Sequence, residues 1–518
     1  MTYYENCVGT QIEMDISENN RRIIRNTLFL YFRMFFTMLI NLFTVRIVLR
    51  ALGVEDYGIY NVIGGVVSMF SILGGSLASG TQRFLAFELG KKDYIRLKEV
   101  FNMTVIVYWI VSFIVLILLE TLGLWFVNYK MNIPSDRILA ANYIFQFSML
   151  SFLVNMISIP YNALIIARER MTAFAYIGIL EASLKLLCSI LLWKVIYDKL
   201  IVHSILILLV TILIRCIYQI YCKRNMPESK FCFFWDVILC KSLLIYSGWN
   251  MIGSLALLLR NQGINIVLNL FFGPLVNAAH AIAQQVNGAI SQLATNIYTS
   301  TRPQIVKYYA NNDFSQMWNL VYISSKFSYY LLLLLCLPIF FLIDHILYLW
   351  LGEVPGNTVL ITRLLILNLL IESMTNQIVA VFQAANKLRK CQSYSSSVLL
   401  FNVPVSYLLL RLFDNVAIPY LISIFLSIVY IGVQMYIAKD EIQLNVTEYT
   451  KRVMIKVFVV TILSSILPFI LLYVLEGGIF YQMIVFCMVS FFSSIFAIWF
   501  IGLTENERSY MKTYLKHK

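Results

Sequence analysis

Two stretches of sequence, 220 positions apart, decide the fold. Residues 53–93 read GVEDYGIYNVIGGVVSMFSILGGSLASGTQRFLAFELGKKD, and residues 273–313 read GPLVNAAHAIAQQVNGAISQLATNIYTSTRPQIVKYYANND. Turn and polar residues coincide without a gap, as does an asparagine before each stretch: Gly53 and Gly273, Thr81 and Thr301, Asp93 and Asp313, Asn41 and Asn261. Each stretch predicts a glycine turn, a helix of small residues and an amphipathic polar segment. The chain therefore contains an internal repeat.

The composition is that of a membrane protein. Of 518 residues, 60% are hydrophobic and only 13% are charged, whereas a soluble protein is about half apolar and a quarter charged. A helix that spans a membrane needs about 20 apolar residues. The apolar runs predict an all-α polytopic protein of about fourteen transmembrane helices, near 24–50, 57–80, 101–128, 139–166, 172–196, 200–222, 241–272, 274–300, 321–351, 357–386, 393–413, 416–438, 453–476 and 478–502.

The position of the repeat predicts how these helices are organised. An even number of helices separates the two copies, so both have the same orientation in the membrane. Such parallel repeats form two pseudo-symmetric lobes around a central cavity, where transporters bind their substrates. The domains expected are an N-terminal segment (1–23), a first lobe (24–222), a linker (223–240), a second lobe (241–438), two further helices (439–502) and a basic tail (503–518).

The formal charge of +13 has a membrane explanation. The chain has no water-exposed basic domain that would hold a nucleic acid, so we expect none as a partner. When the loops are assigned alternately to the two sides, the side of the N-terminus carries 28 of the 40 lysines and arginines and the opposite side carries seven. Loops on the cytoplasmic side are rich in these residues, so both termini are expected to be cytoplasmic.

Signatures of catalysis and of cofactor binding are missing from the sequence. It contains no glycine-rich phosphate loop, no HExxH motif and no CxxC pair among its nine cysteines. We therefore expect no enzyme activity, no cofactor and no metal. Because no ATPase motif is present, any active transport would be driven by an ion gradient, by the membrane potential or by consumption of the substrate.

Charged and polar residues inside the helices are the candidate site. Such groups are costly in a membrane and usually face a bundle interior or water. Arg33 and Arg260 have no carboxylate close in sequence, and cations of this kind suit a phosphate or an acidic sugar. Polar residues on the seventh and eighth helices lie near Arg260 or share one helical stripe. The candidate substrate-binding residues are Arg33, Arg260, Asn261, Asn277, His280 and Gln284.

Each of these residues also has a structural alternative. Asparagine and other small polar residues mediate helix packing, and His280 could be a hydrogen-bonded structural residue or a proton carrier. Glu372 could couple transport to a proton or cation, or it could be the counter-ion of Arg33 or Arg260. Glu181 and Lys185, four positions apart, are expected to neutralise each other. Arg46 and Arg215 are expected to extend to the membrane interfaces.

Three segments carry a resemblance to a known family. They are RIVLRALGVEDYGIYNVIGG with TQRFLAFELGKKD in the first repeat copy, IPYNALIIARERMTAFAYIGILEASLKL at 159–186, and the second repeat copy at 273–313. The chain resembles bacterial polysaccharide and O-antigen flippases. These belong to the multidrug/oligosaccharidyl-lipid/polysaccharide (MOP) exporter superfamily, with the multidrug/cation antiporters and the peptidoglycan-precursor flippase.

The resemblance implies a function. The protein would move a polyprenyl-pyrophosphate-linked oligosaccharide, the repeat unit of an O-antigen (lipopolysaccharide) or of a capsular or exopolysaccharide, across the bacterial inner membrane by alternating access. The glycan and pyrophosphate would occupy the cavity while the polyprenyl tail stays in lipid, and a glycan polymerase with its chain-length machinery could be partners. The cavity arginines of the peptidoglycan-precursor flippase lie at other spacings from the glycine turn, so no role is transferred to Arg33 or Arg46.

Two other functions remain open at this point. A drug/cation antiporter of the same fold would prefer carboxylates in the cavity, whereas this chain offers more arginine there. A membrane-embedded glycan polymerase or ligase would be expected to carry a long outer loop with clustered polar residues. The outer loops here, near 129–138, 197–200 and 352–357, are short.

Overall fold

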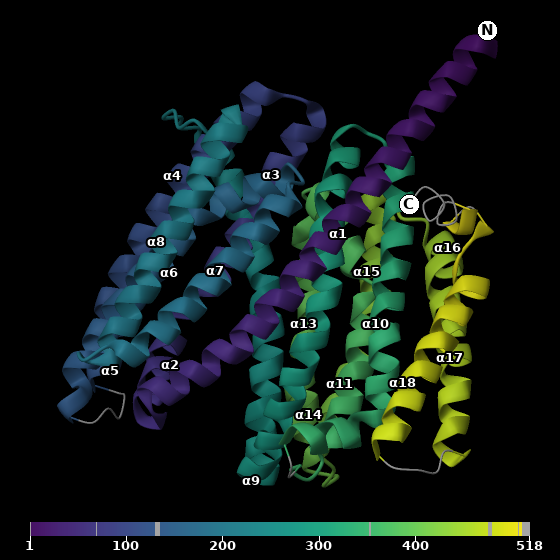
Figure 1. Ribbon diagram of the computed structural model, residues 1–518. Helices are drawn as coiled ribbons and strands as arrows, with labels where there is room; N and C mark the ends of the chain where they lie inside the picture. Colours follow the sequence, from purple (N-terminus) through teal and green to yellow (C-terminus); the bar gives the residue numbers. More distant parts are fainter. Residues whose placement is uncertain are drawn as a thin grey trace. The chain divides into compact units, whose positions relative to one another are not determined.

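The protein is helical throughout the residues that the computed structural model describes, which are 2–68, 70–129, 135–351, 354–474, 479–505 and 507–509 (Figure 1). No strand occurs in these ranges. The break between the predicted spans 453–476 and 478–502, and residues 510–518 of the predicted basic tail, lie outside them. The described helices form two compact units, Met1–Met251 and Ile252–Lys518.

The first unit contains eight α-helices and the beginning of a ninth. Their bounds are α1 Thr2–Leu52, α2 Val54–Ser68, α3 Ser71–Lys91, α4 Tyr94–Leu118, α5 Leu124–Tyr129, α6 Ile138–Ala167, α7 Met171–Leu191, α8 Lys199–Asn225 and α9 Val237–Ala310. A π-helical turn, η1 Leu119–Gly123, joins α4 to α5. The boundary between the units falls inside α9, and the predicted domain limits stay a prediction.

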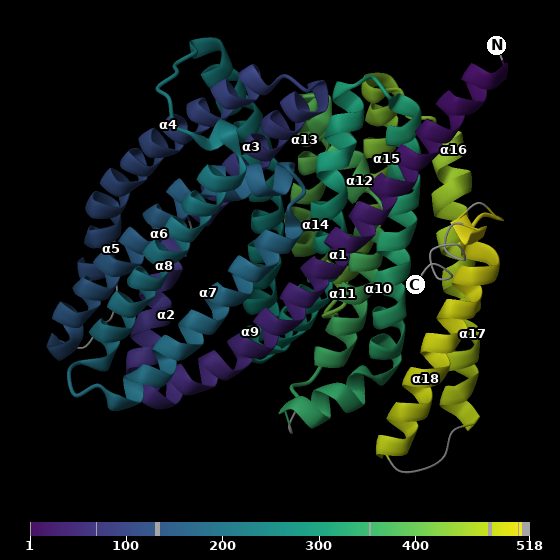
Figure 2. The same cartoon turned by 45° about the horizontal axis from the view of Figure 1, so that its top comes forward.

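The second unit contains the rest of α9 and the C-terminal helices. They are α10 Phe314–Leu351, α11 Thr358–Ser373, α12 Asn376–Ala384, α13 Leu388–Leu400, α14 Asn402–Leu410, α15 Ile418–Ile442, α16 Val446–Tyr449, α17 Ile455–Val474 and α18 Ile479–Ala497. Two π-helical turns, η5 Thr450–Met454 and η6 Ile498–Gly502, lie before α17 and after α18. In both views α17 and α18 run side by side next to α10, which they contact (Figure 2).

Thirteen helical segments of the described residues are long and apolar enough to cross a membrane. They correspond to thirteen of the fourteen predicted spans, so the all-α multi-pass fold is confirmed. The remaining prediction, 274–300, is helical as the second part of α9 but is not among the thirteen. The polar residues predicted to line a site there, with Gln285, Asn287 and Asn296, lower the hydropathy of this segment.

The internal repeat is visible in the backbone. Gly53 and Gly273 both have positive φ, +85° and +75°. Gly53 separates α1 from α2, and Gly273 forms a kink that divides α9 into two helical parts. Farther along, Lys92 and Asn312 end α3 and α9 with left-handed φ values of 59° and 58°. The following Asp93 and Asp313 accept hydrogen bonds from backbone N–H groups three positions on, at 2.9 Å and 3.2 Å, which is helix N-capping.

The repeat extends into α8 and α15, where the offset is 217 positions. Both helices end at matching positions, Asn225 and Ile442. The ring of His203 contacts Tyr60 at 5.1 Å in the first unit, and Tyr420 contacts His280 at 5.8 Å in the second. Since Tyr60 matches His280 and His203 matches Tyr420, the same pair joins the same two helices with the residues exchanged.

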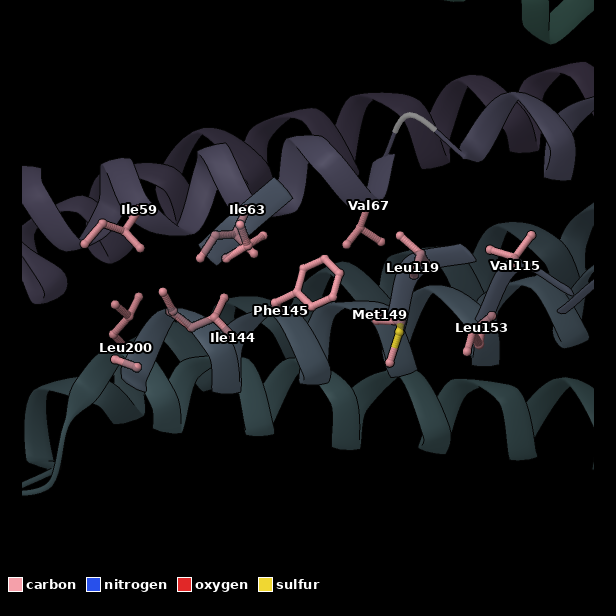
Figure 3. Packing of buried hydrophobic residues seen from close by; sticks show 13 residues of the cluster. Ile59, Ile63, Val67, Val115, Leu119, Ile144, Phe145, Met149, Leu153 and Leu200 are labelled. Atoms are coloured by element: carbon pink, nitrogen blue, oxygen red, sulfur yellow. The ribbon is translucent and has the colours of Figure 1, made fainter. Parts of the chain in front are cut away.

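Each unit has an apolar core of its own. In the first unit, Ile63 of α2, Leu119 of η1 and Phe145 of α6 are fully buried together with neighbours from α8 (Figure 3). In the second, Leu268 of α9 and Ile361 of α11 are fully buried in a separate cluster. Many large apolar side chains elsewhere are exposed, which a protein surface in contact with lipid requires.

The conformation of Gly273 makes the glycine turn testable. Its φ of 75° and ψ of −168° are a conformation essentially reserved for glycine, and a Cβ there would meet no atom within 4 Å. We expect Gly273→Ala to lower the free energy of unfolding by about 1–3 kcal/mol through backbone strain alone. Thermal unfolding of the purified protein measures this.

The matched control is Gly288→Ala in the same helix. Gly288 also has open space around its Cα, but it has no positive φ, so alanine should leave the Tm unchanged or raise it slightly. Equal Tm changes in the two variants would contradict the role given to the glycine turn.

Candidate functional site

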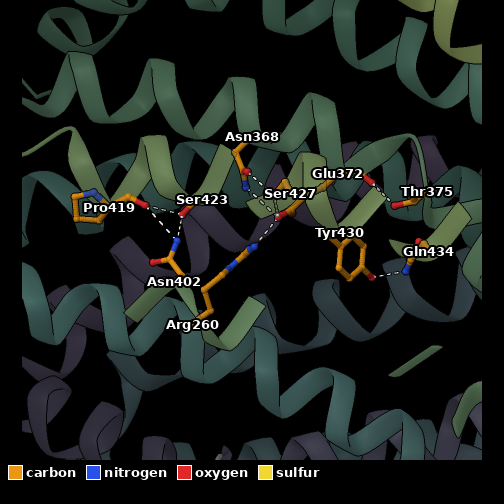
Figure 4. Close-up of polar contacts among 10 residues, drawn as sticks. All are labelled: Arg260, Asn368, Glu372, Thr375, Asn402, Pro419, Ser423, Ser427, Tyr430 and Gln434. Carbon is orange, nitrogen blue, oxygen red and sulfur yellow. Dashed lines mark hydrogen bonds and ion pairs between the residues drawn. The ribbon is translucent and has the colours of Figure 1, made fainter. Parts of the chain in front are cut away.

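The strongest polar site of the second unit is built around Glu372 (Figure 4). Arg260 of α9 donates through Nη1 to Oε1 of Glu372 on α11 at 2.7 Å. Asn368, one turn earlier on α11, donates its amide to the same oxygen at 3.0 Å. Ser427 of α15 donates to Asn368 Oδ1 at 2.8 Å and lies 3.2 Å from Glu372 Oε1. Three helices therefore meet at one carboxylate.

The two charges of this pair differ in exposure. The Arg260 side chain is 8% exposed, whereas that of Glu372 is 29% exposed. All contacts from described residues fall on Oε1 of Glu372, and Oε2 receives none. The pair neutralises Arg260, and the partly exposed Glu372 keeps a second carboxylate oxygen without a hydrogen bond from the described residues. Of the alternatives for Glu372, the geometry contains the pairing with Arg260, and its role in coupling stays a prediction.

Further polar contacts lie on the α15 side of the network. Asn402 of α14 donates to Ser423 Oγ at 2.9 Å. Nearer the C-terminal end of α15, Gln434 donates to the Tyr430 hydroxyl at 2.6 Å. His280 of α9 forms a hydrogen bond through Nδ1 with the Tyr420 hydroxyl at 2.7 Å, and both residues are buried. This contact agrees with the structural alternative for His280.

The corresponding feature of the first unit is Arg33 on α1. Its guanidinium stacks on the ring of Phe174 of α7 at 4.4 Å, a cation–π contact. A Cβ on Gly178 would lie 2.9 Å from Arg33 Cδ, so glycine lets the arginine lie against α7. Glu181, one turn farther along α7, acts on Arg33 electrostatically.

Glu181 is shared between two cations. Lys185 Nζ lies 2.6 Å from Glu181 Oε1, which confirms the predicted pairing. Because Arg33 is also near this carboxylate, the cluster of Arg33, Lys185 and Glu181 keeps one positive charge in excess. The sequence could not show this proximity, since Arg33 and Glu181 are almost 150 residues apart.

The remaining candidates are not brought into one site by hydrogen bonds. Asn261 is exposed, while Asn277 and Gln284 are half-buried. The side-chain oxygen of Asn277 is buried without a hydrogen-bond partner among the described residues. Ser291 and Thr295, farther along the same helix, donate hydrogen bonds to carbonyls of that helix. The described residues contain no group of His, Cys, Asp and Glu that could hold a metal ion.

Several polar residues of the Glu372 network were missed in the sequence. Asn368 lies four positions before Glu372 and so shares its helix face. On α15, Tyr420, Ser423, Ser427 and Gln434 recur at helical spacing and would have revealed a polar stripe. This periodicity was the available signal, although it does not say which carboxylate the stripe faces.

The sequence comparison identifies the family. Residues 23–309 match the family described as "Polysaccharide biosynthesis protein". The chain belongs to this family. The match covers most of the first unit and the second repeat copy, and it confirms the resemblance seen in those segments. No curated protein sequence matches the chain.

Solved structures of the MOP superfamily share the fold. A multidrug resistance MATE family transporter in an outward-facing conformation has 14% identity and a TM-score of 0.70, with 81% of this chain and 96% of that one covered. A MATE protein in the bent conformation has 14% identity and a TM-score of 0.71, with 84% of this chain and 96% of that one covered. The third structure is a MOP superfamily transporter from Pyrococcus furiosus, whose binding pocket is described as of reverse polarity. It has 14% identity and a TM-score of 0.67, with 81% of this chain and 96% of that one covered. These similarities show that the chain has the fold of these transporters.

The Arg260–Glu372 pair makes an asymmetric stability prediction. Glu372→Gln leaves a buried guanidinium without its carboxylate, which costs about 3 kcal/mol. Arg260→Gln leaves a carboxylate that keeps Asn368 and Ser427 and has access to water, so it should cost clearly less. Thermal unfolding of the two single variants and the double variant forms a mutant cycle. A larger loss for Arg260→Gln, or no coupling between the two changes, would refute this description.

Proposed function

We propose that the protein is a flippase that moves a polyprenyl-pyrophosphate-linked oligosaccharide, an O-antigen or capsular/exopolysaccharide repeat unit, across the membrane by alternating access. The family description supports the polysaccharide part of this proposal. The observation that carries the substrate class is the excess positive charge of the Arg33 cluster in the first unit. A cation that is only partly neutralised suits a phosphate group.

The geometry of Arg33 fits a role in binding the pyrophosphate. The cation–π contact with Phe174 holds the guanidinium against α7 without using an acceptor oxygen, so its N–H donors can serve a phosphate. A planar guanidinium presents donors in a fork that matches phosphate oxygens. Arg260, in contrast, already has a carboxylate partner, so it would act on the substrate only if Glu372 released it. Asn261, Asn277, His280 and Gln284 are proposed as glycan contacts.

Glu372 supplies a route to ion coupling. Its Oε1 is held by Arg260 and Asn368, whereas Oε2 accepts no hydrogen bond from the described residues. A proton or a small cation arriving at Oε2 would weaken the hold of Glu372 on Arg260. Binding of an ion would thereby be linked to the packing of α9, α11 and α15, which is the type of linkage that coupled transport needs.

The proposed setting follows from the topology. The resemblance to bacterial flippases supports a location in a bacterial inner membrane, and the distribution of lysine and arginine favours both termini in the cytoplasm. A glycan polymerase and its chain-length machinery are the proposed partners, because a flipped repeat unit needs polymerisation. No enzyme activity is proposed. The alternative is a drug/cation antiporter, the class to which one structurally similar protein belongs.

Arg33→Gln tests the anion site. In liposomes with a fluorescent polyprenyl-pyrophosphate oligosaccharide, a membrane-impermeant quencher reports how much label reaches the opposite leaflet. We expect the translocation rate to fall at least tenfold in Arg33→Gln, the equivalent of about 1.4 kcal/mol of lost interaction with phosphate. The control is Arg46→Gln, an exposed arginine on the same helix with no partner among the described residues.

The outcomes separate the two functions. Equal rates in the two arginine variants would remove Arg33 from the substrate site. No translocation by the unmodified protein, together with gradient-driven movement of a cationic dye, would assign it to the antiporters.

Glu372→Gln tests coupling. We expect this variant to lower the ratio of the rate in an imposed proton gradient to the gradient-free rate, a ratio that does not depend on how much of the protein is folded. The matched control is Asp344→Asn, which changes the carboxylate of an exposed ion pair with Arg363 in the same unit. A full response to the gradient in Glu372→Gln would exclude Glu372 as an obligatory coupling group.

A further inference from the structure

A second charged cluster lies far along the chain from the proposed substrate site, where α10 passes the C-terminal helices. α10 has 38 residues, so at 1.5 Å per residue it is about 57 Å long and exceeds a hydrocarbon core of about 30 Å. Lys326 marks the point on α10 after which the sequence becomes almost continuously apolar. It is 2% exposed and forms an ion pair with Glu507 at 2.6 Å.

Three more cations surround this pair. Lys456 of α17 interacts electrostatically with Lys326, Arg508 and Arg452 as well as with Glu507. Two of these cations form ion pairs with carboxylates: Lys326 with Glu507, and Arg452 with Glu448 at 2.9 Å. Glu505, two positions before Glu507, is exposed. Burial would raise the pKa of Glu507, but hydrogen bonds from Lys326 and Thr504 lower it below its ordinary value, so this carboxylate stays charged. Four cations and two anions leave an excess of two positive charges.

Lys456 and Arg508 are the cations without a carboxylate of their own. Lys456 is half-buried and has no ion-pair partner among the described residues. Arg508 donates through Nη2 to the carbonyls of Phe500 and Leu503, at 2.7 Å and 3.1 Å. Its Nε is buried with no partner in the described part of the chain. A donor in this state indicates that an acceptor is missing.

An apolar groove lies between α17 and α18. It measures about 660 Å³ and includes Leu463, Ile466, Met488, Phe492, Phe496 and Ile501 in its lining. Ile501 of this lining directly follows Phe500, and Arg508 donates to the Phe500 carbonyl at 2.7 Å, so the groove and Arg508 meet at this turn of the chain. Phe492 and Phe496 are largely exposed, 58% and 65%, which makes the groove open to the surrounding lipid.

We propose that α17 and α18 hold an anionic phospholipid, with its phosphate between Lys456 and Arg508 and an acyl chain in the groove. Basic pockets between membrane helices bind acidic headgroups in this way. The excess charge selects an anionic over a zwitterionic lipid. The adjoining apolar groove selects a phospholipid over free phosphate, because only a lipid fills both parts. The site is independent of the transported substrate and of the proposed function.

Lipid binding to the purified full-length protein tests this site. Phosphatidylglycerol and phosphatidylcholine with the same acyl chains are titrated in detergent, and bound lipid is counted by native mass spectrometry. We expect phosphatidylglycerol to bind at least tenfold more tightly than phosphatidylcholine, and Lys456→Gln to reduce that preference several-fold. Lys456→Gln with Arg508→Gln should abolish it.

Two further variants guard against a folding defect. Lys451→Gln removes an exposed lysine five positions before Lys456, in η5, and should keep the full preference. Val489→Trp fills the groove and should weaken both lipids while the basic cluster stays intact. Arg508 also binds backbone carbonyls, so the double variant could be unstable. In that case the result for Lys456→Gln alone decides the question.

The opposing results are equally definite. Equal binding of the two lipids, or an unchanged preference in Lys456→Gln, would overturn the proposal. Displacement of phosphatidylglycerol by inorganic phosphate at the same concentration would show a phosphate site without a lipid. Displacement by polyprenyl phosphate in preference to phosphatidylglycerol would assign the groove to a polyprenyl lipid instead.

Discussion

A charge inside a membrane helix must find its partner within the chain, because lipid offers no hydrogen bonds. The pairing of Arg260 with Glu372 meets this constraint in the second unit, and α9, α11 and α15 are joined through it. Asn368 and Ser427 complete the site with neutral donors, which hold the carboxylate without adding charge. The positions of three helices thus depend on one ion pair whose components are 112 residues apart.

The two units share a backbone plan but differ in charge. Gly53 and Gly273, Asp93 and Asp313, and the exchanged tyrosine–histidine pairs occupy matching positions. In the second unit, Arg260 is neutralised by Glu372, whereas the matching residue of the first unit is Ile40. The first unit instead places Arg33 against α7 and leaves its charge partly uncompensated. Duplication therefore accounts for the helices and turns, and later divergence accounts for the site.

The fold was predictable to a large extent, for physical reasons. Apolar runs are set by the thickness of a membrane, so thirteen spans coincide with predicted ones. The glycine turns and aspartate caps have local causes that sequence alone contains. The site was less predictable, because partners such as Glu181 for Arg33 and Tyr420 for His280 come from distant helices. Hydropathy records that a residue is polar, and only the packing decides what it faces.

The buried cations of the chain fall into two kinds, those that stabilise the packing of helices and those that can bind an anion. Arg260 and Lys326 are almost completely buried and each has one carboxylate, so loss of that partner would leave an uncompensated charge. Arg33, Lys456 and Arg508 are half-buried, and none has an ion pair of its own among the described residues. Cations of the first kind hold helices together. Cations of the second kind remain able to bind an anion from outside the chain, and a phosphate is the anion that fits both a guanidinium and a membrane surface.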